Sequence, residues 1–446
     1  MSRNAWRAAA LAALLGAAGL AGPAALPAQS GEPVPVVTLE EARRRAASAN
    51  ADAVAARGDV ATAVWERRAA MAELFTPSLS ADMGYTRFSD PFFNFGTGEI
   101  TPNATSATLQ ARYVLLGAGR VGELRRARAS LASAEAGETA ARFRVALETD
   151  AAYYAVLADR ELVRVAAERL RRAEEQFAVA RVRVLAGEAI SSDSLQLLLE
   201  VNRARLGVLR RDSALTTSRL RLGRSVGLAG PAEAAPVDTA ALPPLPFGSE
   251  EAVRLMRAGG PEVEAARAAE RSADAAVLAQ REAYLPEIAV GATTGAYDSE
   301  LFPSAFRRSQ LAVTVSLPIW DGARRELAQA RANVARDVAR AEREERERAA
   351  AEVMTGAWHG YETARAGTAL ARSAVAVSAE SFRVQRARYR EGATTILDLL
   401  EAQVALGEAE AELVQARYAT RLALARVEAL LGRRIHETTT TGPTDR

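Results

Sequence analysis

Two carboxylates, Asp398 and Glu401, are the residues whose spacing points most directly to chemistry. They follow Gly392 and lie three positions apart, so on a helix they share one face of its first turn. Grouped carboxylates attract cations and can bind divalent ions. The alternative is the ordinary preference of acidic side chains for a helix N-terminus, which the helix dipole favours.

No combination of residues typical of an enzyme accompanies them. Cys is absent, which excludes disulfides, thiolate metal sites and Cys nucleophiles, and the only histidines are His359 and His436. The sequence has no HExxH, no P-loop and no GxGxxG after a strand. We therefore expect no catalytic residue, no metal site and no cofactor.

The charges of the chain are nearly balanced. There are 57 Lys+Arg against 55 Asp+Glu, a net charge of +2, and every one of the 57 is Arg. This excess is too small to favour a nucleic-acid partner.

Two long proline-free segments, 103–230 and 319–442, must position the carboxylates. They are rich in Ala, Arg and Glu, and proline breaks a helix interior at a cost of about 3 kcal/mol. Each is interrupted once by a Gly-containing turn, near 187–193 and near 392–398. Glycine can end one helix in a left-handed cap, and Ser, Thr or Asp can start the next. Each segment therefore predicts a long helical hairpin.

The returning arm of each hairpin carries a seam of small and apolar residues in alternating steps of three and four. This spacing favours close antiparallel helix packing. The first seam is Leu195, Leu199, Asn202, Leu206, Leu209, Ser213, Thr216 and Leu220, and the second is Leu406, Ala409, Leu413, Ala416, Thr420, Ala423, Val427 and Leu430.

The chain reads as a tandem duplication. Gly187 and Gly392 lie 205 positions apart, as do Asp193 and Asp398, which indicates an internal repeat and a pseudo-symmetric product. The expected divisions are a first repeat, a Pro/Ala-rich linker, a second repeat and a polar tail, at 29–230, 231–247, 248–435 and 436–446.

The N-terminal segment 1–28 is typical of a secretory signal peptide. Arg3 and Arg7 precede an apolar run at 8–20, and small residues follow, with cleavage expected near Ala25 or Ala28. Later segments lack an apolar run of transmembrane-helix length, so any contact with a membrane must be made by strands.

Apolar residues alternate with other residues in two predicted strand pairs. These are about 78–88 with 106–116 and about 286–297 with 309–320. Such runs of about 9–11 residues are long enough for a tilted strand to cross a bilayer. Four strands cannot close a barrel, and open edges are not tolerated in lipid, whereas three chains would supply twelve strands. The alternative is a small soluble β cap on a coiled coil.

Three segments together resemble the TolC-like outer-membrane efflux proteins (outer-membrane factors). The most specific is 389–403 (YREGATTILDLLEAQ), and 187–195 is its partner in the first repeat. The segment 317–322 (LPIWDG) resembles the family's strand-to-helix junction, whereas its equivalent 115–120 (LLGAGR) lacks the proline and the acid. The resemblance covers about 37–435.

The resemblance implies a mainly α fold with a small β part. Tandem-duplicated helical hairpins would form an α-barrel, and four transmembrane strands per chain would form a trimeric 12-stranded β-barrel. The implied homotrimer lies in outer-membrane lipid with a large periplasmic portion. It is expected to export small molecules or proteins that an inner-membrane pump and a periplasmic adaptor (membrane fusion protein) deliver. The sequence names neither the exported substrate nor the pump class.

The resemblance also implies roles at the two turns. Under three-fold symmetry, Asp398 and Glu401 would form two carboxylate rings at a pore constriction. Tyr389 and Asp193 are expected to form a hydrogen-bonded tip latch, the alternative for Tyr389 being an ordinary packed side chain. Gly187 and Gly392 are expected to be adaptor-docking tips, besides capping their helices. Similar proteins often have an arginine where this chain has Thr394, which puts a second, charged latch in doubt.

A different class of function is a non-channel periplasmic coiled-coil protein that bridges other components or acts as an adaptor. An adaptor normally has one hairpin with lipoyl-like and barrel domains, so strand pairs in two equal halves favour the channel.

Overall fold

The computed structural model describes residues 34–94, 98–117, 119–187, 190–238, 240–299 and 306–435. The chain divides into two units, Met1–Pro35 and Val36–Arg446, and the account that follows concerns the second. The predicted signal peptide at 1–28, the polar tail at 436–446 and His436 lie outside the described residues.

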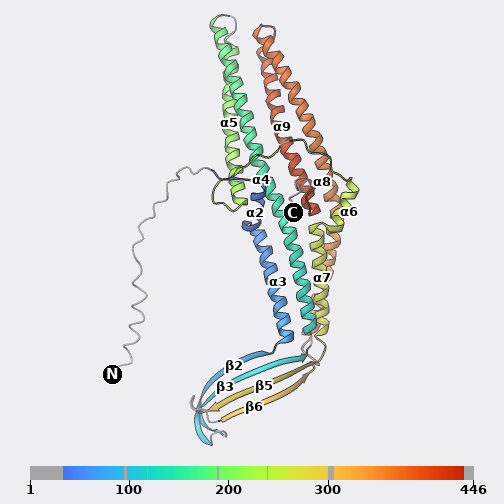
Figure 1. The fold of residues 1–446 in the computed structure, drawn as a ribbon. Helices are drawn as coiled ribbons and strands as arrows, with labels where there is room; N and C mark the ends of the chain where they lie inside the picture. Colours follow the sequence, from blue (N-terminus) through green and yellow to red (C-terminus); the bar gives the residue numbers. More distant parts are fainter. Residues whose placement is uncertain are drawn as a thin grey trace, which may run out of the picture. The chain divides into compact units, whose positions relative to one another are not determined.

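The second unit is mainly helical, with one four-stranded sheet at the end of the long helices (Figure 1). This confirms the predicted fold class at the level of one chain. In chain order the elements are β1 (Val36–Val37), α2 (Leu39–Ala49), α3 (Ala51–Phe75), β2 (Ser78–Asn94), β3 (Glu99–Leu116), α4 (Arg120–Leu185), α5 (Ser191–Ser225), β4 (Glu233–Ala234), α6 (Ser249–Gly259), α7 (Pro261–Glu282), β5 (Glu287–Asp298), β6 (Phe306–Ser316), α8 (Arg324–Arg390) and α9 (Ile396–Leu431).

The helices α4 and α8 are the longest elements, with 66 and 67 residues, and both lie in proline-free sequence. At 1.5 Å per residue each is about 100 Å long. Their returning partners α5 and α9 have 35 and 36 residues. Among the described residues, no helix contains an apolar stretch long enough to cross a membrane.

The two repeats pack against each other along their helices. Helix α4 contacts α5 in its own hairpin and also α7 and α9 of the second repeat. Partway along the helices, β1, α2, the linker and α6 lie against α4, α8 and α9. We call this level the equatorial layer. It contains the two largest buried clusters, one around Tyr153 and one around Tyr361.

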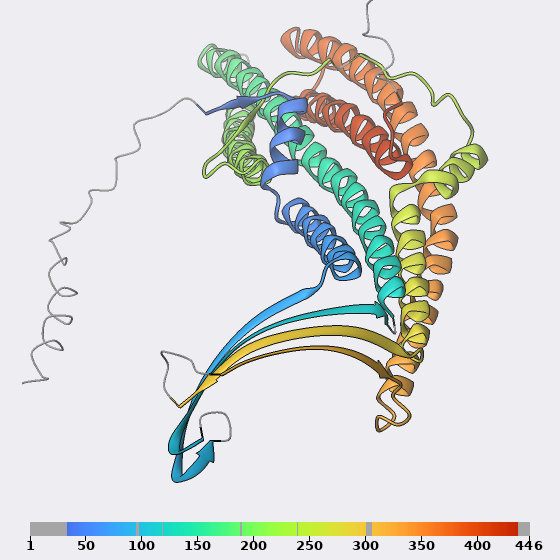
Figure 2. The ribbon, with the colours of Figure 1, turned by 60° about the horizontal axis from the view of Figure 1, so that its bottom comes forward.

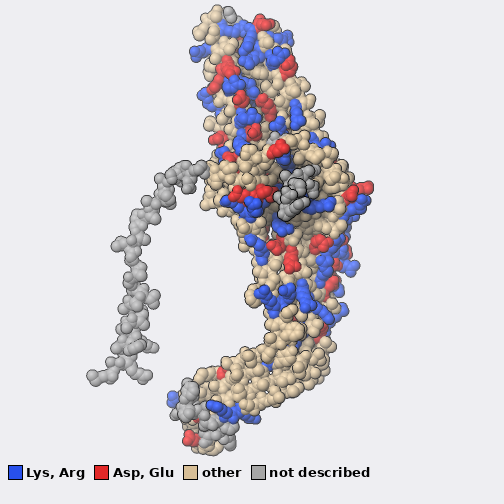
Figure 3. All heavy atoms as spheres, in the orientation of Figure 1, with Lys and Arg blue, Asp and Glu red and all other residues tan. Residues whose placement is uncertain are grey.

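The sheet is antiparallel, with strand order β2-β3-β5-β6, and it is curved (Figure 2). The two repeats meet at its centre, since β3 pairs with β5. Because side chains alternate along a strand, each row of paired residues lies on one face. One row is Leu79, Ala111, Ala292 and Leu311, and the next is Ser80, Gln110, Thr293 and Gln310. One face is therefore apolar and the other polar. Near the helices the sheet surface carries few charges in Figure 3, unlike the helical part.

The first strand pair is longer than the predicted 78–88 and 106–116. Strands β2 (Ser78–Asn94) and β3 (Glu99–Leu116) each continue through a proline. Pro91 lies in the edge strand β2, in a stretch where the register with β3 shifts. Pro102 lies before Thr105, where the pairing of β3 with β5 begins. Edges and irregular pairing are the places where a sheet accepts a residue without an N–H.

The second strand pair ends earlier than the predicted 309–320. Strand β6 spans Phe306–Ser316, and Pro318 follows directly after its end. Proline cannot donate a ladder hydrogen bond, so it favours the end of the strand here.

The two predicted seams have different surroundings. The second seam, on α9, lies within the chain, where Leu406 and Val427 are buried. The first seam, on α5, faces outward, and Leu209 is 64% exposed. Helix α5 packs on α4 through its other face, at Leu197 and Val201, so this chain does not cover its first seam.

Candidate functional site

The candidate site is the pair of tips where α4 turns into α5 and α8 turns into α9 (top of Figure 1). Gly187 and Gly392 have φ of 76° and 71°, left-handed values that strain any residue with a side chain. No atom lies within 4 Å of a Cβ built at either position, and both glycines are exposed. The glycines thus end the long helices and leave the surface around them open.

Asp398 is held by the start of its own helix. Thr395 is the N-cap of α9, and its side chain and that of Asp398 form a reciprocal capping box. The Asp398 Oδ2 atom accepts hydrogen bonds from Thr395 Oγ1 at 2.6 Å, Thr394 Oγ1 at 2.8 Å and the Thr395 N–H at 3.0 Å. These bonds lower the pKa of Asp398, because they stabilise its ionised form. The carboxylate is therefore ionised and oriented by the two threonines.

Glu401, one turn further along α9, is exposed and has no ion pair among the described residues. It lies on the same side of the helix as Leu397 and Glu408, which are also exposed. Of the two predicted ring residues, Glu401 is thus the one whose carboxylate has no partner on its own helix.

Asp193 occupies the same position in α5 as Asp398 does in α9, but its surroundings differ. The N-cap of α5 is Ile190, which has no side-chain hydrogen bond to offer. No capping box forms, and the Asp193 carboxylate makes no hydrogen bond among the described residues. The difference between Ile190 and Thr395 therefore leaves Asp193 available for another partner.

Tyr389, the predicted partner of Asp193, is 7% exposed and packs among Leu197, Phe382 and Leu399. Its hydroxyl makes no hydrogen bond within the described part of the chain, so the predicted bond to Asp193 is not formed here. Burial raises the pKa of Tyr389, and the charge of Asp193 raises it further, whereas the charge of Arg183 lowers it.

Arg183, near the end of α4, joins the two tips. Its Nη1 atom donates to the Tyr389 carbonyl at 2.9 Å, and its guanidinium lies 5.6 Å from the centre of the Tyr389 ring. This residue was not predicted from the sequence. The sequence did mark this position, because Arg183 and Arg388 are 205 positions apart and are therefore equivalent arginines of the two repeats.

The first tip also exposes apolar side chains that were not predicted from the sequence as part of the site. Val182, Leu185 and Ile190 are 65%, 80% and 69% exposed. The second tip is more polar, with Arg388, Arg390 and Glu391 in its last helical turn and cap. The two tips thus offer surfaces of different chemistry.

Nothing in the described ranges resembles a metal centre, since no group of three or more His, Asp or Glu side chains could hold an ion. The chain does have two uncovered edges. The sheet ends in the unpaired strands β2 and β6. Exposed apolar residues also lie on α3 (Val54, Trp65, Phe75), on α5 (Leu206, Leu209) and on α8 (Leu327, Val334, Leu370, Val377).

Comparison with known proteins identifies this architecture. The family model described as outer membrane efflux protein matches residues 66–228 and 252–433, well over half of the chain. A search of the curated proteins found none that matches the sequence.

Solved outer-membrane channels share the fold. Campylobacter jejuni CmeC has a TM-score of 0.76 and 16% identity, covering 90% of this chain and 87% of that one. Neisseria gonorrhoeae MtrE, in its open state, has a TM-score of 0.73 and 20% identity, covering 90% and 91%. Vibrio cholerae VceC has a TM-score of 0.71 and 18% identity, covering 89% and 97%.

Proposed function

Because the chain belongs to the outer membrane efflux protein family, we propose that three copies form an outer-membrane channel-tunnel. It exports small molecules or proteins, delivered by an inner-membrane pump and a periplasmic adaptor, to the cell exterior. The channel itself carries out no reaction, and the pump supplies the energy.

The observation that carries this proposal is the pair of uncovered edges. The sheet has β2 at one edge and β6 at the other. In the helical part, exposed apolar residues lie on α3 and α5, which both pack on α4, and on α8, which packs on α7 and α9. Unpaired strand edges and outward apolar seams are stabilised by pairing with another chain. Because the two edges differ, the contact is head-to-tail, and such contacts close into a ring if the rotation allows it.

The two faces of the sheet support a membrane barrel. The apolar row containing Leu79 and Leu311 suits lipid, and the polar row containing Gln110 and Thr293 suits a water-filled lumen. Closure with neighbouring copies would satisfy the backbone groups of β2 and β6, as the hydrocarbon core requires. The long helices would then extend into the periplasm.

The tips are the proposed sites of docking and gating. Gly187 and Gly392 leave open surface for adaptor hairpins, and the exposed Leu185 and Ile190 add an apolar contact at the first tip. Asp398 and Glu401 would form carboxylate rings if α9 lines the pore. Tyr389 and Asp193 remain a proposed latch, which would form only after a small shift, since their hydrogen bond is not made in this chain.

The decisive experiment measures both assembly and conductance. We expect the detergent-purified protein to have the mass of a trimer and to give discrete channels in planar bilayers. Leu206→Glu with Leu209→Glu, on the exposed seam, should yield monomers, whereas Glu174→Gln, which alters an exposed ion pair between α4 and α5, should not. A monomer that stays soluble without detergent would contradict the proposal.

The carboxylate rings have their own test in the same recordings. Glu401→Gln should weaken block by multivalent cations more than Asp398→Asn, because Asp398 is already engaged by Thr394 and Thr395. Unchanged block in the double variant would remove the rings from the proposal without affecting the channel.

A bridging protein without a channel is the second candidate. It is favoured only by the long hairpins, which bridging and channel proteins share. The sheet with one apolar and one polar face has no role in such a protein, and conductance separates the two functions.

A further inference from the structure

A small pocket of about 130 Å³ lies in the equatorial layer, between the linker and helices α8 and α9. Four arginines line it, Arg365 and Arg372 from α8 and Arg417 and Arg421 from α9, together with Thr368 and Thr420. The linker covers it at Ala240. One water needs roughly 10–15 Å³ by this measure, so the pocket has room for a small ion with a few waters.

The charges around this pocket are not balanced. No acidic residue lines it. Arg365 pairs with Glu362 at 2.7 Å, but Arg372, Arg417 and Arg421 have no ion pair among the described residues. The Nε atom of Arg417 is buried and has no hydrogen-bond partner. Arg417 and Arg421 are half-buried and Arg372 is exposed. Because partly desolvated cations are normally paired, four arginines that share one ion pair favour a bound counter-ion.

The first repeat shows what fills a comparable position. There, Glu233 of the linker pairs with Arg160 of α4 at 3.4 Å and with Arg219 of α5. Arg365 follows Arg160 by 205 positions, the offset between the repeats. The linker thus supplies a carboxylate to the arginines of the first repeat, but only Ala240, Ala241 and Leu242 to those of the second.

From this contrast we infer that the pocket binds a small oxyanion of the phosphate or sulfate type. Guanidinium groups bind such anions through paired N–H donors, and several of them around one site neutralise its charge. The hydroxyls of Thr368 and Thr420 already donate to the Ala364 and Ala416 carbonyls, so the arginines provide the recognition. The anion joins the linker to both helices of the second hairpin, independently of the proposed export.

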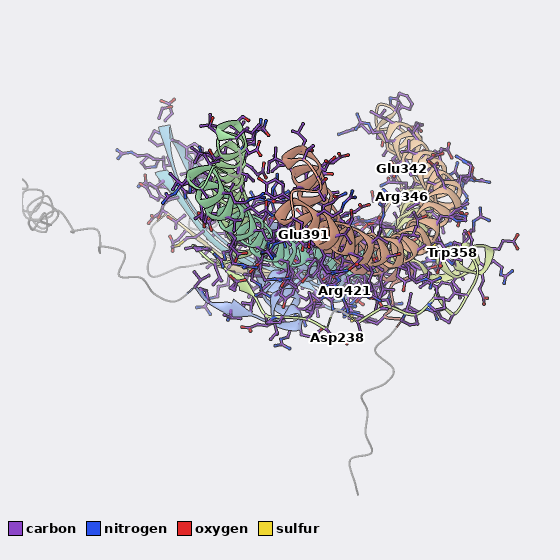
Figure 4. All side chains as sticks on the ribbon, turned by 90° about the horizontal axis from the view of Figure 1, so that it is seen from above. Asp238, Glu342, Arg346, Trp358, Glu391 and Arg421 are labelled. Carbon is purple, nitrogen blue, oxygen red and sulfur yellow. The ribbon has the colours of Figure 1, made fainter. Side chains whose placement is uncertain are left out.

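Asp238 is the carboxylate nearest along the linker. It is exposed, and its Oδ1 atom accepts from the Ala240 N–H at 2.9 Å. Arg421 donates to the Ala240 carbonyl at 3.5 Å, and Figure 4 shows Asp238 and Arg421 toward the side where the linker runs. Asp238 is thus engaged by the linker itself, so the pocket is left to an external anion.

The test uses inorganic phosphate as the probe. In detergent and at constant ionic strength, phosphate should raise the melting temperature of the full-length protein above its value in chloride, and titration calorimetry should show one site per chain. Arg417→Gln and Arg372→Gln should each weaken binding about tenfold or more, the effect of losing a hydrogen bond to a charged group. Glycerol phosphate, which resembles a lipid headgroup, is the second probe. A pocket for a free anion should bind inorganic phosphate more tightly than glycerol phosphate, whereas a pocket open to lipid headgroups should bind the two probes equally.

Arg426→Gln is the matched control, because Arg426 is an exposed residue of the same helix outside the pocket. It should bind phosphate as the wild type does. Arg372 is exposed, so its variant keeps the test valid even if Arg417→Gln fails to fold. Equal melting temperatures in phosphate and chloride, or equal loss of binding in Arg426→Gln, would overturn the inference.

Discussion

In the equatorial layer, the two central buried tyrosines have hydrogen-bond partners, whereas near the tips several buried polar groups do not. The Tyr153 hydroxyl donates to the Ala235 carbonyl at 2.7 Å, and the Tyr361 hydroxyl donates to the Pro243 carbonyl at 2.6 Å. Near the tips, the Tyr389 hydroxyl and both amide atoms of Gln403 are buried without a hydrogen bond in the described chain. The same two hairpins contain both regions.

This difference indicates how stability is distributed. A satisfied polar network fixes one packing arrangement, while each unsatisfied buried group costs about 1–3 kcal/mol. Regions that must move are drawn from the less stable parts of a structure. The equatorial layer therefore serves as the fixed frame, and the tips are the part that can rearrange.

The largest expected effect comes from removing a buried ion pair in the equatorial layer. Arg43 of α2 donates two hydrogen bonds to Asp150 of α4, at 2.6 Å and 2.5 Å, and both side chains are mostly buried. Arg43→Met would leave the Asp150 carboxylate buried without its partner, so we expect a loss of about 3–5 kcal/mol in unfolding free energy. Chemical denaturation of the purified protein followed by circular dichroism measures it.

The matched control is the double variant Arg43→Met with Asp150→Leu, which removes both charges. It should recover most of the stability, since an apolar pair can replace a buried ion pair. An Arg43→Met protein as stable as the wild type would show that the equatorial layer is not held by this pair.

The second prediction has the opposite sign and concerns the tip half. Gln403 is 0% exposed, and neither of its amide atoms has a partner among the described residues. Gln403→Met keeps the volume and removes the unsatisfied groups, so the unfolding free energy should rise by about 1–3 kcal/mol. If the tip must open, the same change should also lower channel opening in planar bilayers. A destabilised variant would mean that an unseen partner satisfies Gln403.

The third prediction compares two tyrosines by the same substitution. Tyr361→Phe removes a hydrogen bond to the linker and should cost about 1 kcal/mol. Tyr389→Phe removes a hydroxyl that has no partner in the described chain, so its stability should be unchanged or slightly higher. Parallel melting curves test the pair. If the proposed latch with Asp193 forms in the assembled channel, the Tyr389→Phe channel should also open more often than the wild type. Equal losses of stability in Tyr361→Phe and Tyr389→Phe would contradict the difference between the equatorial layer and the tips.

The smallest expected effect concerns pH at the second tip. The pKa of Asp398 lies below its usual value of about 4, so its cap contributes stability above that pH and loses it as the pH falls through the lowered pKa. The melting-temperature difference between wild type and Asp398→Ala should therefore stay constant from pH 7 to about 5 and shrink at more acid pH. Leu397→Ala, which changes an exposed uncharged side chain in the same helical turn, is the control and should give no such trend.

Much of this fold could be predicted from local sequence rules. The absence of proline predicted the long helices, and the glycines with the Ser/Thr/Asp that follow predicted the turns between them. The full length of β2 and β3 could not be predicted, because Pro91 and Pro102 suggest loops. Only the structure shows that Pro91 lies in an edge strand and that Pro102 precedes the part of β3 that pairs with β5. The exposure of the Leu209 seam likewise depends on which helices cover α5.

The site was predictable in position more than in contacts. The role of Asp398 follows from the spacing of Thr395 and Asp398, a capping-box pattern that is visible in the sequence. The contact of Arg183 with Tyr389 joins α4 to α8, and such a contact depends on how the two hairpins pack. The proposed latch depends on that packing too, which is why the Tyr389 hydroxyl without a partner was not foreseen.

The central pairing of β3 with β5 has a practical consequence for dissecting this protein. Each half contributes two neighbouring strands and its own hairpin, and the halves are connected covalently only through the linker. Two separately translated fragments, divided in the linker after β4, each keep their own strand pair, β2 with β3 and β5 with β6. Pairing of β3 with β5 could then recombine them by complementation. Each half could then be labelled or replaced on its own.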